Sequence, residues 1–191
     1  MDDLERCWWG GGDRPDPRMQ AYHDTEWGVP VTDDVELFER LTLEAFQAGL
    51  SWQTILNKRE TFRAAFRGFD LAVVAAFDDA DRARLMADAG IVRNRAKIDA
   101  TINNAVAFRA VVEEFGSFDA YLATIVPRPP TRLPATAVGG SIPAATPVSD
   151  ALSKDLKRRG FRFVGSTIVY AFMQSVGLVD DHLPGCFRYR G

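Results

Sequence analysis

The chain has 191 residues, of which 47% are hydrophobic and 26% are charged, and its formal net charge is -3 with a sequence pI of about 5.4. This length fits one domain, or at most two small ones, with enough apolar residues for a core. No stretch approaches 18 uninterrupted apolar residues, and the acidic start Met1-Asp2-Asp3 is unlike a signal peptide, so we expect an intracellular protein with no membrane partner. The mild acidity excludes uniform attraction to nucleic acid, and DNA binding would need local basic clusters.

The first 31 residues show little helical periodicity and are predicted to form a loop punctuated by Gly and Pro. Aromatic rings are concentrated in this segment. Such rings either pack in a core, which is the default for any one of them, or offer flat faces to a planar ligand. The rings are those of Trp8, Trp9, Tyr22 and Trp27, and the fourth tryptophan is Trp52.

The stretch LEAFQAGLSW places an acid where helical periodicity asks for an apolar residue. Glu44 shares its stripe with Leu37 and Leu41. Because removing a carboxylate from water costs several kcal/mol unless a partner compensates, such a residue is either hydrogen-bonded to a helix end or lines a pocket. Gly49 then breaks the helix, and Trp52 follows in the next one.

The remaining elements follow from caps and apolar periodicity, and they predict an all-α single domain over residues 1–191 with no repeat, linker or convincing strand pair. Residues 127–148 contain six prolines and are expected to be an extended loop within the domain. We predict helices from Asp34 to Ala48, from Ser51 to about Phe66 (Ile55, Phe62 and Phe66 inward), after the caps Asp70 and Asp78, from about Asn94 to Gly116 (apolar stripe Ile98, Ile102, Val106, Val112), over residues 117–126, from the cap Ser149 to Gly160, and from Val164 to Val176.

A tight turn at Gly90, between two helices, is followed by the basic residues Arg93, Arg95 and Lys97. A helix-hairpin-helix offers backbone amides and basic side chains to a DNA phosphate in this way, so these four residues are our first candidates for phosphate contact. The pattern is equally typical of a plain helix connector. The basic helix from Lys154 to Arg162 is the second candidate, with a solvated surface as its alternative.

The only two Cys and two His residues form two spaced pairs, Cys7 with His23 and His182 with Cys186. Four such side chains suit tetrahedral zinc, although the pairs lie at opposite ends of the chain. Free thiols with solvated imidazoles, or a disulfide between Cys7 and Cys186, are the alternatives. The disulfide is disfavoured in an intracellular protein.

Several motifs together resemble the bacterial 3-methyladenine DNA glycosylase I family, of the helix-hairpin-helix DNA glycosylase superfamily. They are AYHDTEWGVP, LEAFQAGLSW, SDALSKDLKRRGFRFVGSTIVYAFMQSVGLVDDH and the closing Cys186, in the family's order and spacing from about Arg6 onward. The resemblance implies an all-α fold with one structural zinc joining the terminal loops. It also implies monofunctional excision of 3-methyladenine, by base flipping, from alkylated double-stranded DNA in the bacterial cytoplasm and nucleoid, with no obligate protein partner.

The resemblance also assigns roles to single residues. Its zinc ligands fall on Cys7, His23, His182 and Cys186, and its base-binding residues on Tyr22, Glu44 and Trp52, with Trp9 and Trp27 nearby. Glu44 is the expected catalytic carboxylate, because the superfamily's usual catalytic Asp has no counterpart between residues 101 and 112. This chain departs from the family at Trp8 and at Ala45-Phe46, where the family often has Gly and a Gly-Gln pair.

Two other functions are compatible with these residues. The first is a non-catalytic, zinc-stabilised module that binds damaged DNA. The second is a zinc hydrolase acting on a small molecule, which a site filled by four protein ligands disfavours because it leaves no position for water.

Overall fold

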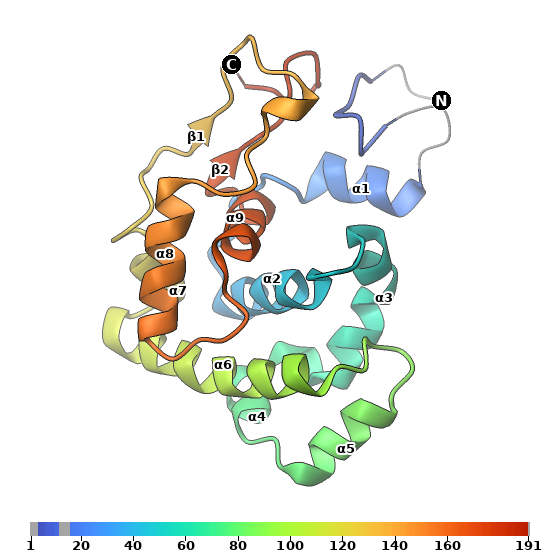
Figure 1. Ribbon diagram of the computed structural model, residues 1–191, viewed down its shortest axis with the longest axis vertical. Coiled ribbons are helices and arrows are strands. Elements are labelled where there is room, and N and C mark those ends of the chain that lie inside the picture. The colour runs from blue at the N-terminus through green and yellow to red at the C-terminus, as the bar shows by residue number, and fades with distance from the viewer. Residues whose placement is uncertain (1–3, 12–15, 191) are drawn as a thin grey trace.

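The computed structural model describes residues 4–11 and 16–190, so predictions about the acidic start and residues 12–15 lie outside the described residues. The described part is mainly helical, as the sequence predicts (Figure 1). No helix in it is long and apolar enough to cross a membrane. The elements are α1 (Pro17–Thr25), α2 (Asp34–Gln47), α3 (Trp52–Ala65), η1 (Arg67–Phe69), α4 (Leu71–Ala75), α5 (Asp79–Ala87), α6 (Arg95–Phe115), α7 (Phe118–Leu122), β1 (Thr131–Arg132), η2 (Gly139–Ser141), α8 (Pro147–Arg158), α9 (Ser166–Ser175) and β2 (Val179–Asp180).

Most helix starts lie where the sequence predicts them, because each has a side-chain cap. An oxygen of the capping residue accepts a hydrogen bond from a free amide of the first turn, which satisfies one of the donors that an isolated helix leaves unpaired. The residues that do so are Asp33, Ser51, Asp70, Asp78 and Asn94, each at or next to a predicted start.

One apolar cluster connects the helices from α2 onward to β2. Figure 1 shows α2 and α9 in the middle of the molecule, with α6 running beneath them, α4 and α5 beyond α6, and α7 and α8 at one side. The inward residues predicted for α3, Ile55, Phe62 and Phe66, are fully buried in this cluster. The buried rings and branched side chains hold α2, which carries Glu44, in the centre of the fold.

Helix α1 corrects the prediction that residues 1–31 form a loop. Asp16 accepts hydrogen bonds from the amides of Arg18 and Met19, and Pro17 occupies the first helical turn. Both are ordinary helix-start signals. The nine-residue helix buries only Tyr22 and His23, so it has almost no apolar stripe for periodicity to detect.

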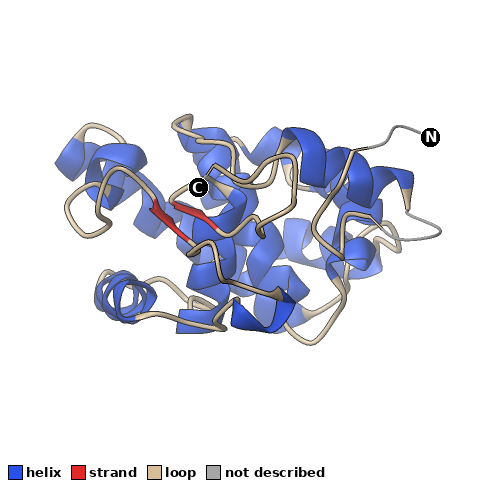
Figure 2. Cartoon of the chain, turned by 90° about the horizontal axis from the view of Figure 1, so that it is seen from above, coloured by secondary structure: helices blue, strands red, loops and turns tan. Residues whose placement is uncertain are grey.

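The proline-rich segment contains a short strand that the sequence did not reveal. Strand β1 pairs in parallel with β2, with Thr131 opposite Val179 and Arg132 opposite Asp180, as Figure 2 shows. A two-residue strand has too few positions to show an alternating pattern. The following helix also starts earlier than predicted, because Thr146 is its cap and Ser149 is the reciprocal partner in a capping box.

Val106 is a further correction, because its side chain is 55% exposed although it lies on the predicted apolar stripe of α6. Its neighbours on the stripe, Ile98 and Ile102, are buried. The buried face of α6 continues through Ala105, Phe108 and Val111, so Val106 lies beside that face although its spacing from Ile102 is helical.

Candidate functional site

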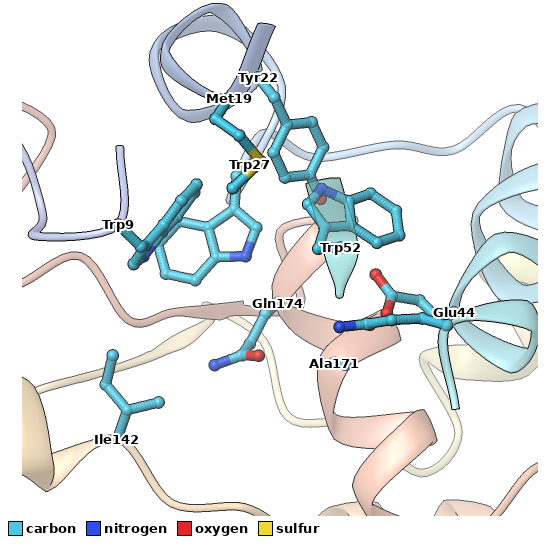
Figure 3. A pocket seen from close by; sticks show the side chains of 10 residues that line it. Trp9, Met19, Tyr22, Trp27, Glu44, Trp52, Ile142, Ala171 and Gln174 are labelled. Atoms are coloured by element: carbon cyan, nitrogen blue, oxygen red, sulfur yellow. The ribbon is translucent and has the colours of Figure 1, made fainter. Parts of the chain in front are cut away.

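A pocket of about 280 Å³ opens between the N-terminal segment, α2, α3 and α9. This volume is close to the lower limit for small-molecule sites, and four of the ten lining residues are aromatic. Figure 3 shows the rings on one side and the carboxylate of Glu44 reaching in from the other. The lining residues are Trp9, Met19, Tyr22, Trp27, Glu44, Gln47, Trp52, Ile142, Ala171 and Gln174.

All five residues expected to bind a base, Trp9, Tyr22, Trp27, Glu44 and Trp52, line this one pocket. They come from distant parts of the chain, which the fold brings together. The rings of Tyr22 and Trp52 lie 5.2 Å apart and are tilted by 45°. The indoles of Trp9 and Trp27 meet edge to face at 4.9 Å. Planar rings at several angles leave a space that suits another flat ring.

Glu44 is the buried acid of the pocket, with 5% of its surface exposed. Its carboxyl has no hydrogen-bond partner among residues 4–11 and 16–190. Burial raises the pKa of Glu44 to about 8, although the guanidinium of Arg40, one helical turn earlier, partly opposes this. Without a ligand, the group is therefore largely protonated at neutral pH.

The cysteine and histidine pairs also meet. Candidate ligand atoms of Cys7, His23 and Cys186 lie within 4.8 Å of one another, and all three residues are buried. The Sγ of Cys186 lies 3.4 Å from Nε2 of His23. Both cysteines are free thiols, so the structure does not contain the alternative disulfide. This group could hold a metal ion.

His182 borders the same cluster, with its ring centroid 5.2 Å from that of His23. Its Nδ1 lies 2.8 Å from Oδ1 of Asp180, while its buried Nε2 has no hydrogen-bond partner within the described part of the chain. His23 likewise uses Nδ1 to contact Asp24 at 2.8 Å. In metal sites a carboxylate commonly orients a histidine in this way and leaves Nε2 for the ion, so the donor set fits a metal.

The metal cluster and the pocket share a wall. The ring of Trp9 lies 5.0 Å from that of His23, and the ring of Trp27 lies 4.7 Å from that of His182. Tyr22 immediately precedes His23 in α1. Anything that fixes the imidazoles therefore also fixes three of the pocket's rings.

The predicted phosphate-contact residues form the hairpin between α5 and α6, and one of them is a correction. The side chain of Lys97 is buried, and its Nζ donates hydrogen bonds to the carbonyls of Phe46 and Ala48 at 2.9 and 2.7 Å. An ammonium group held at the C-terminus of α2 is not free to meet a phosphate. Arg93 and Arg95 are exposed, as phosphate contact requires.

The hairpin turn itself is held by other side chains. The amide of Gly90 donates to Oδ1 of Asp88 at 2.7 Å, so that N–H already has an acceptor. Its carbonyl accepts a hydrogen bond from Thr61 at 2.6 Å. The turn is thus fixed to α3. Arg93 and Arg95 are its exposed cationic candidates, and Arg95 also pairs with Asp99 at 3.0 Å.

Sequence reasoning missed half of the pocket lining. Gln174 had a signal, because it is a polar residue within the apolar run of α9, as Glu44 is within α2. Met19 and Ile142 had none, since one belongs to the unpredicted α1 and the other to the proline-rich loop. Ala45 and Phe46, where the chain departs from the family, are buried in α2 and do not line the pocket.

Comparisons with known proteins agree with this geometry. The methyladenine glycosylase family model matches residues 10–189. DNA-3-methyladenine glycosylase 1 of Escherichia coli (strain K12) is 50% identical over 188 residues, which cover 98% of each chain. A crystal structure of 3-methyladenine DNA glycosylase I matches with a TM-score of 0.91 and 48% identity, covering 97% of this chain and 100% of that one. A variant of such an enzyme in complex with 3-methyladenine has a TM-score of 0.90 at 35% identity, covering 97% and 98%.

The fold and the pocket together define the class as a helix-hairpin-helix DNA glycosylase. Within that class, the chain belongs to the methyladenine glycosylase family.

Proposed function

We propose that this protein is a single-domain, monofunctional DNA repair enzyme that hydrolyses the N-glycosidic bond of 3-methyladenine in alkylated double-stranded DNA. The observation that carries the proposal is a buried acid without a partner in a pocket of aromatic rings. The relatives support it, because those named above are 3-methyladenine DNA glycosylases and one of them binds 3-methyladenine. Because its substrate is DNA, the proposed place of action is the nucleoid in the cytoplasm of a bacterial cell.

The target base has to leave the duplex first. A base within the stack is out of reach, and a methyl group that weakens pairing or stacking lowers the cost of rotating it outward. The base then enters the pocket against the rings of Tyr22 and Trp52, which contact each other, with Trp9 and Trp27 on the remaining wall. Adenine methylated at N3 is cationic while still attached to the sugar, so each ring face attracts it by roughly 0.5–2 kcal/mol.

Glu44 adds a charge-dependent step to this selection. Because burial raises the pKa of Glu44 to about 8, the empty pocket holds a mainly neutral acid at pH 7. A cationic base in contact favours the carboxylate, so Glu44 loses its proton as the base enters and can then accept a hydrogen bond from the exocyclic amine. Neutral adenine offers no charge to offset this ionisation. The acid therefore discriminates against the undamaged base.

Binding of the cation raises the rate only if the attraction grows toward the transition state, where positive charge moves from the base to the sugar. The methyl group has already weakened the glycosidic bond, so a modest catalyst is sufficient. Residues 101–112 of α6 contain no acid, and Glu44 is the proposed catalytic carboxylate. Water is the proposed nucleophile, and no lysine acts through a Schiff base.

The proposed cofactor is one structural zinc ion held by Cys7, His23, His182 and Cys186. The three gathered ligands and the unpartnered Nε2 of His182 support this set. A zinc ion with four protein ligands has no open position for water, so it supplies cross-linking rather than chemistry. It would join the N-terminal segment to the C-terminal tail and fix the imidazoles behind Trp9 and Trp27.

Release of free base from methylated DNA tests the proposal. The protein is incubated with DNA treated with a methylating agent, and the purines set free are separated and identified. We expect 3-methyladenine in the soluble fraction. Binding of methylated DNA without release of any base would overturn the proposal and favour the non-catalytic damage-binding module.

A further inference from the structure

Gln174 is a pocket residue to which the resemblance gives no role. It is a polar residue on the apolar helix α9, and it lines the pocket together with Glu44. Its Nε2 donates a hydrogen bond of 2.8 Å to Oδ2 of Asp181, which is 4% exposed. The same Oδ2 accepts a bond of 2.6 Å from the hydroxyl of Tyr170.

This contact fixes which end of the amide faces the ligand. An amide side chain has a donor end and an acceptor end of nearly equal shape, and a carboxylate only accepts hydrogen bonds. Asp181 therefore binds the nitrogen of the Gln174 amide, and the oxygen, Oε1, is the end that remains available to a ligand. Oε1 has no hydrogen-bond partner within the described part of the chain. In Figure 3 the amide nitrogen is turned away from Glu44 and the oxygen toward it.

We propose that Oε1 of Gln174 is an acceptor that selects purines with a 6-amino group over purines with a 6-oxo group. Asp181 acts through Gln174 as a positioning residue, because it prevents the amide from rotating to present its donor. The inference deepens the proposed function and rests on it, since both concern a methylated base in this pocket.

The chemistry of the two bases gives the selection its direction. The 6-amino group of 3-methyladenine carries two N–H donors, which can serve two acceptors. The carboxylate of Glu44 and Oε1 of Gln174 are two acceptors in the pocket wall, to which Gln47 also contributes an amide. In 3-methylguanine the 6-position is a carbonyl oxygen. The carbonyl oxygen of 3-methylguanine and Oε1 of Gln174 are both acceptors, so neither can donate a hydrogen bond to the other. Both lose their water on binding and gain no partner, which is unfavourable.

The test measures release of 3-methyladenine and 3-methylguanine from the same methylated DNA. Replacement of Gln174 by Met keeps an unbranched side chain of similar length and removes the acceptor. We expect kcat/KM for 3-methyladenine to fall by about 3- to 10-fold, the effect of one hydrogen bond, while release of 3-methylguanine stays constant or rises. The ratio of the two rates therefore falls by about 3- to 10-fold or more.

Two further variants separate positioning from contact. Asp181→Asn lets the neighbouring amide turn either end toward the pocket, so the ratio should fall as it does in Gln174→Met. Tyr170→Phe removes the other hydrogen bond to the same Oδ2 and keeps the bond to Gln174, so it is the matched control and should leave the ratio unchanged. Because Asp181 precedes His182, metal content and thermal unfolding are measured for each variant.

The outcomes distinguish the two proposals. Wild-type protein that releases no 3-methyladenine overturns the proposed function and this inference with it. Wild-type protein that releases it, with Gln174→Met keeping the wild-type ratio of the two bases, overturns the inference alone. An Asp181→Asn variant with wild-type metal content and a wild-type ratio overturns the positioning role of Asp181.

Discussion

The pocket end of the molecule and the hairpin end treat their polar groups in opposite ways. At the hairpin, the amide and carbonyl of Gly90 both have partners, and the buried ammonium of Lys97 donates to two carbonyls. At the pocket end, buried nitrogens are left without partners, and so is the carboxyl of Glu44. Within residues 4–11 and 16–190, such nitrogens belong to Trp52 in the pocket wall and to His182 beside the cysteine cluster, and also to Arg40 and Arg188, which are part of neither.

This comparison separates buried polar groups that stabilise the fold from those that are available to a ligand or metal. An unpaired buried polar atom costs roughly 1–3 kcal/mol, so a fold keeps several together mainly where a ligand or metal is to complete them. A buried polar group with all its partners, such as Lys97, holds elements in place. Substitutions at the two ends should therefore act differently, on ligand and metal at one and on stability at the other.

Loss of a proposed metal ligand should give the largest effect. We expect Cys7→Ser to lose zinc and to lower the free energy of unfolding by at least about 3 kcal/mol, because metal binding contributes directly to folding. For a chain of this size, that lowers Tm by roughly 6–12 °C. Metal analysis and thermal unfolding check the prediction. A chelator should lower the Tm of the wild-type protein and leave that of the variant unchanged, and full zinc content in the variant would contradict the ligand assignment.

Glu44→Gln should lower excision of 3-methyladenine by about 100-fold, the order of magnitude for removing one preorganised electrostatic contact. The matched control is Glu39→Gln on the same helix. Glu39 is also buried, but it is paired with Arg63 at 2.8 Å outside the pocket. We expect near-normal excision from the folded control. Equal loss of activity in the two variants would show that any buried acid of α2 matters and would remove the special role of Glu44.

Lys97→Met should reduce stability by about 2–3 kcal/mol, because it leaves two carbonyls at the C-terminus of α2 without their charged donor. Lys58→Met is the control. Lys58 also donates to two carbonyls, those of Ala89 and Gly90, but it is only partly buried, so its loss should cost less than about 1 kcal/mol. Denaturant unfolding measures both. A larger cost for Lys58 would reverse the assignment of the structural lysine.

The pH dependence of excision should reveal the raised pKa of Glu44. If the carboxylate is the active form, kcat/KM rises about tenfold between pH 7 and pH 9 and levels off above the free-enzyme pKa of about 8. Glu44→Gln should not show this rise. A profile that is already flat from pH 6 upward in the wild-type protein would show that the acid is ionised in the empty pocket.

The pH dependence of the free energy of unfolding tests the raised pKa of Glu44 independently of activity. The native-state pKa lies above the ordinary value of 4.5, so the native state binds more protons than the unfolded state between about pH 4.5 and 8. The free energy of unfolding therefore falls as pH rises through that window, by the contribution of Glu44. The stability of Glu44→Gln relative to wild type should increase over the same window and then stay constant.

Charge reversal at the hairpin should have the smallest effect. We expect Arg95→Glu to weaken DNA binding by about 3- to 10-fold at low salt and to reduce the salt dependence of binding, as loss of one phosphate contact does. Arg109→Glu is the control, because it makes the same charge change at an exposed position of the same helix, 14 residues further on. Equal weakening by both variants would indicate a general charge effect and no contact at the hairpin.

The sequence by itself determined most helices, since their caps and apolar spacing act over only a few residues. It also determined the pocket set Trp9, Tyr22, Trp27, Glu44 and Trp52, although partly through resemblance to a family rather than from spacing. Helix α1 could have been found from Asp16 and Pro17, which are ordinary start signals. The two-residue strands could not, because their pairing joins positions 48 residues apart.

Only the tertiary structure decided which polar residues are structural. The sequence predicts that Lys97 contacts a phosphate. The packing of α6 against α2 instead makes Lys97 a structural residue that donates hydrogen bonds to the C-terminus of α2. Gln174 looks like an incidental polar residue, and its contact with Asp181 turns its oxygen into the pocket. The raised pKa of Glu44 also depends on burial by several elements. The burial of a side chain and its hydrogen-bond partners depend on residues that are distant in the chain, so local sequence patterns cannot predict them.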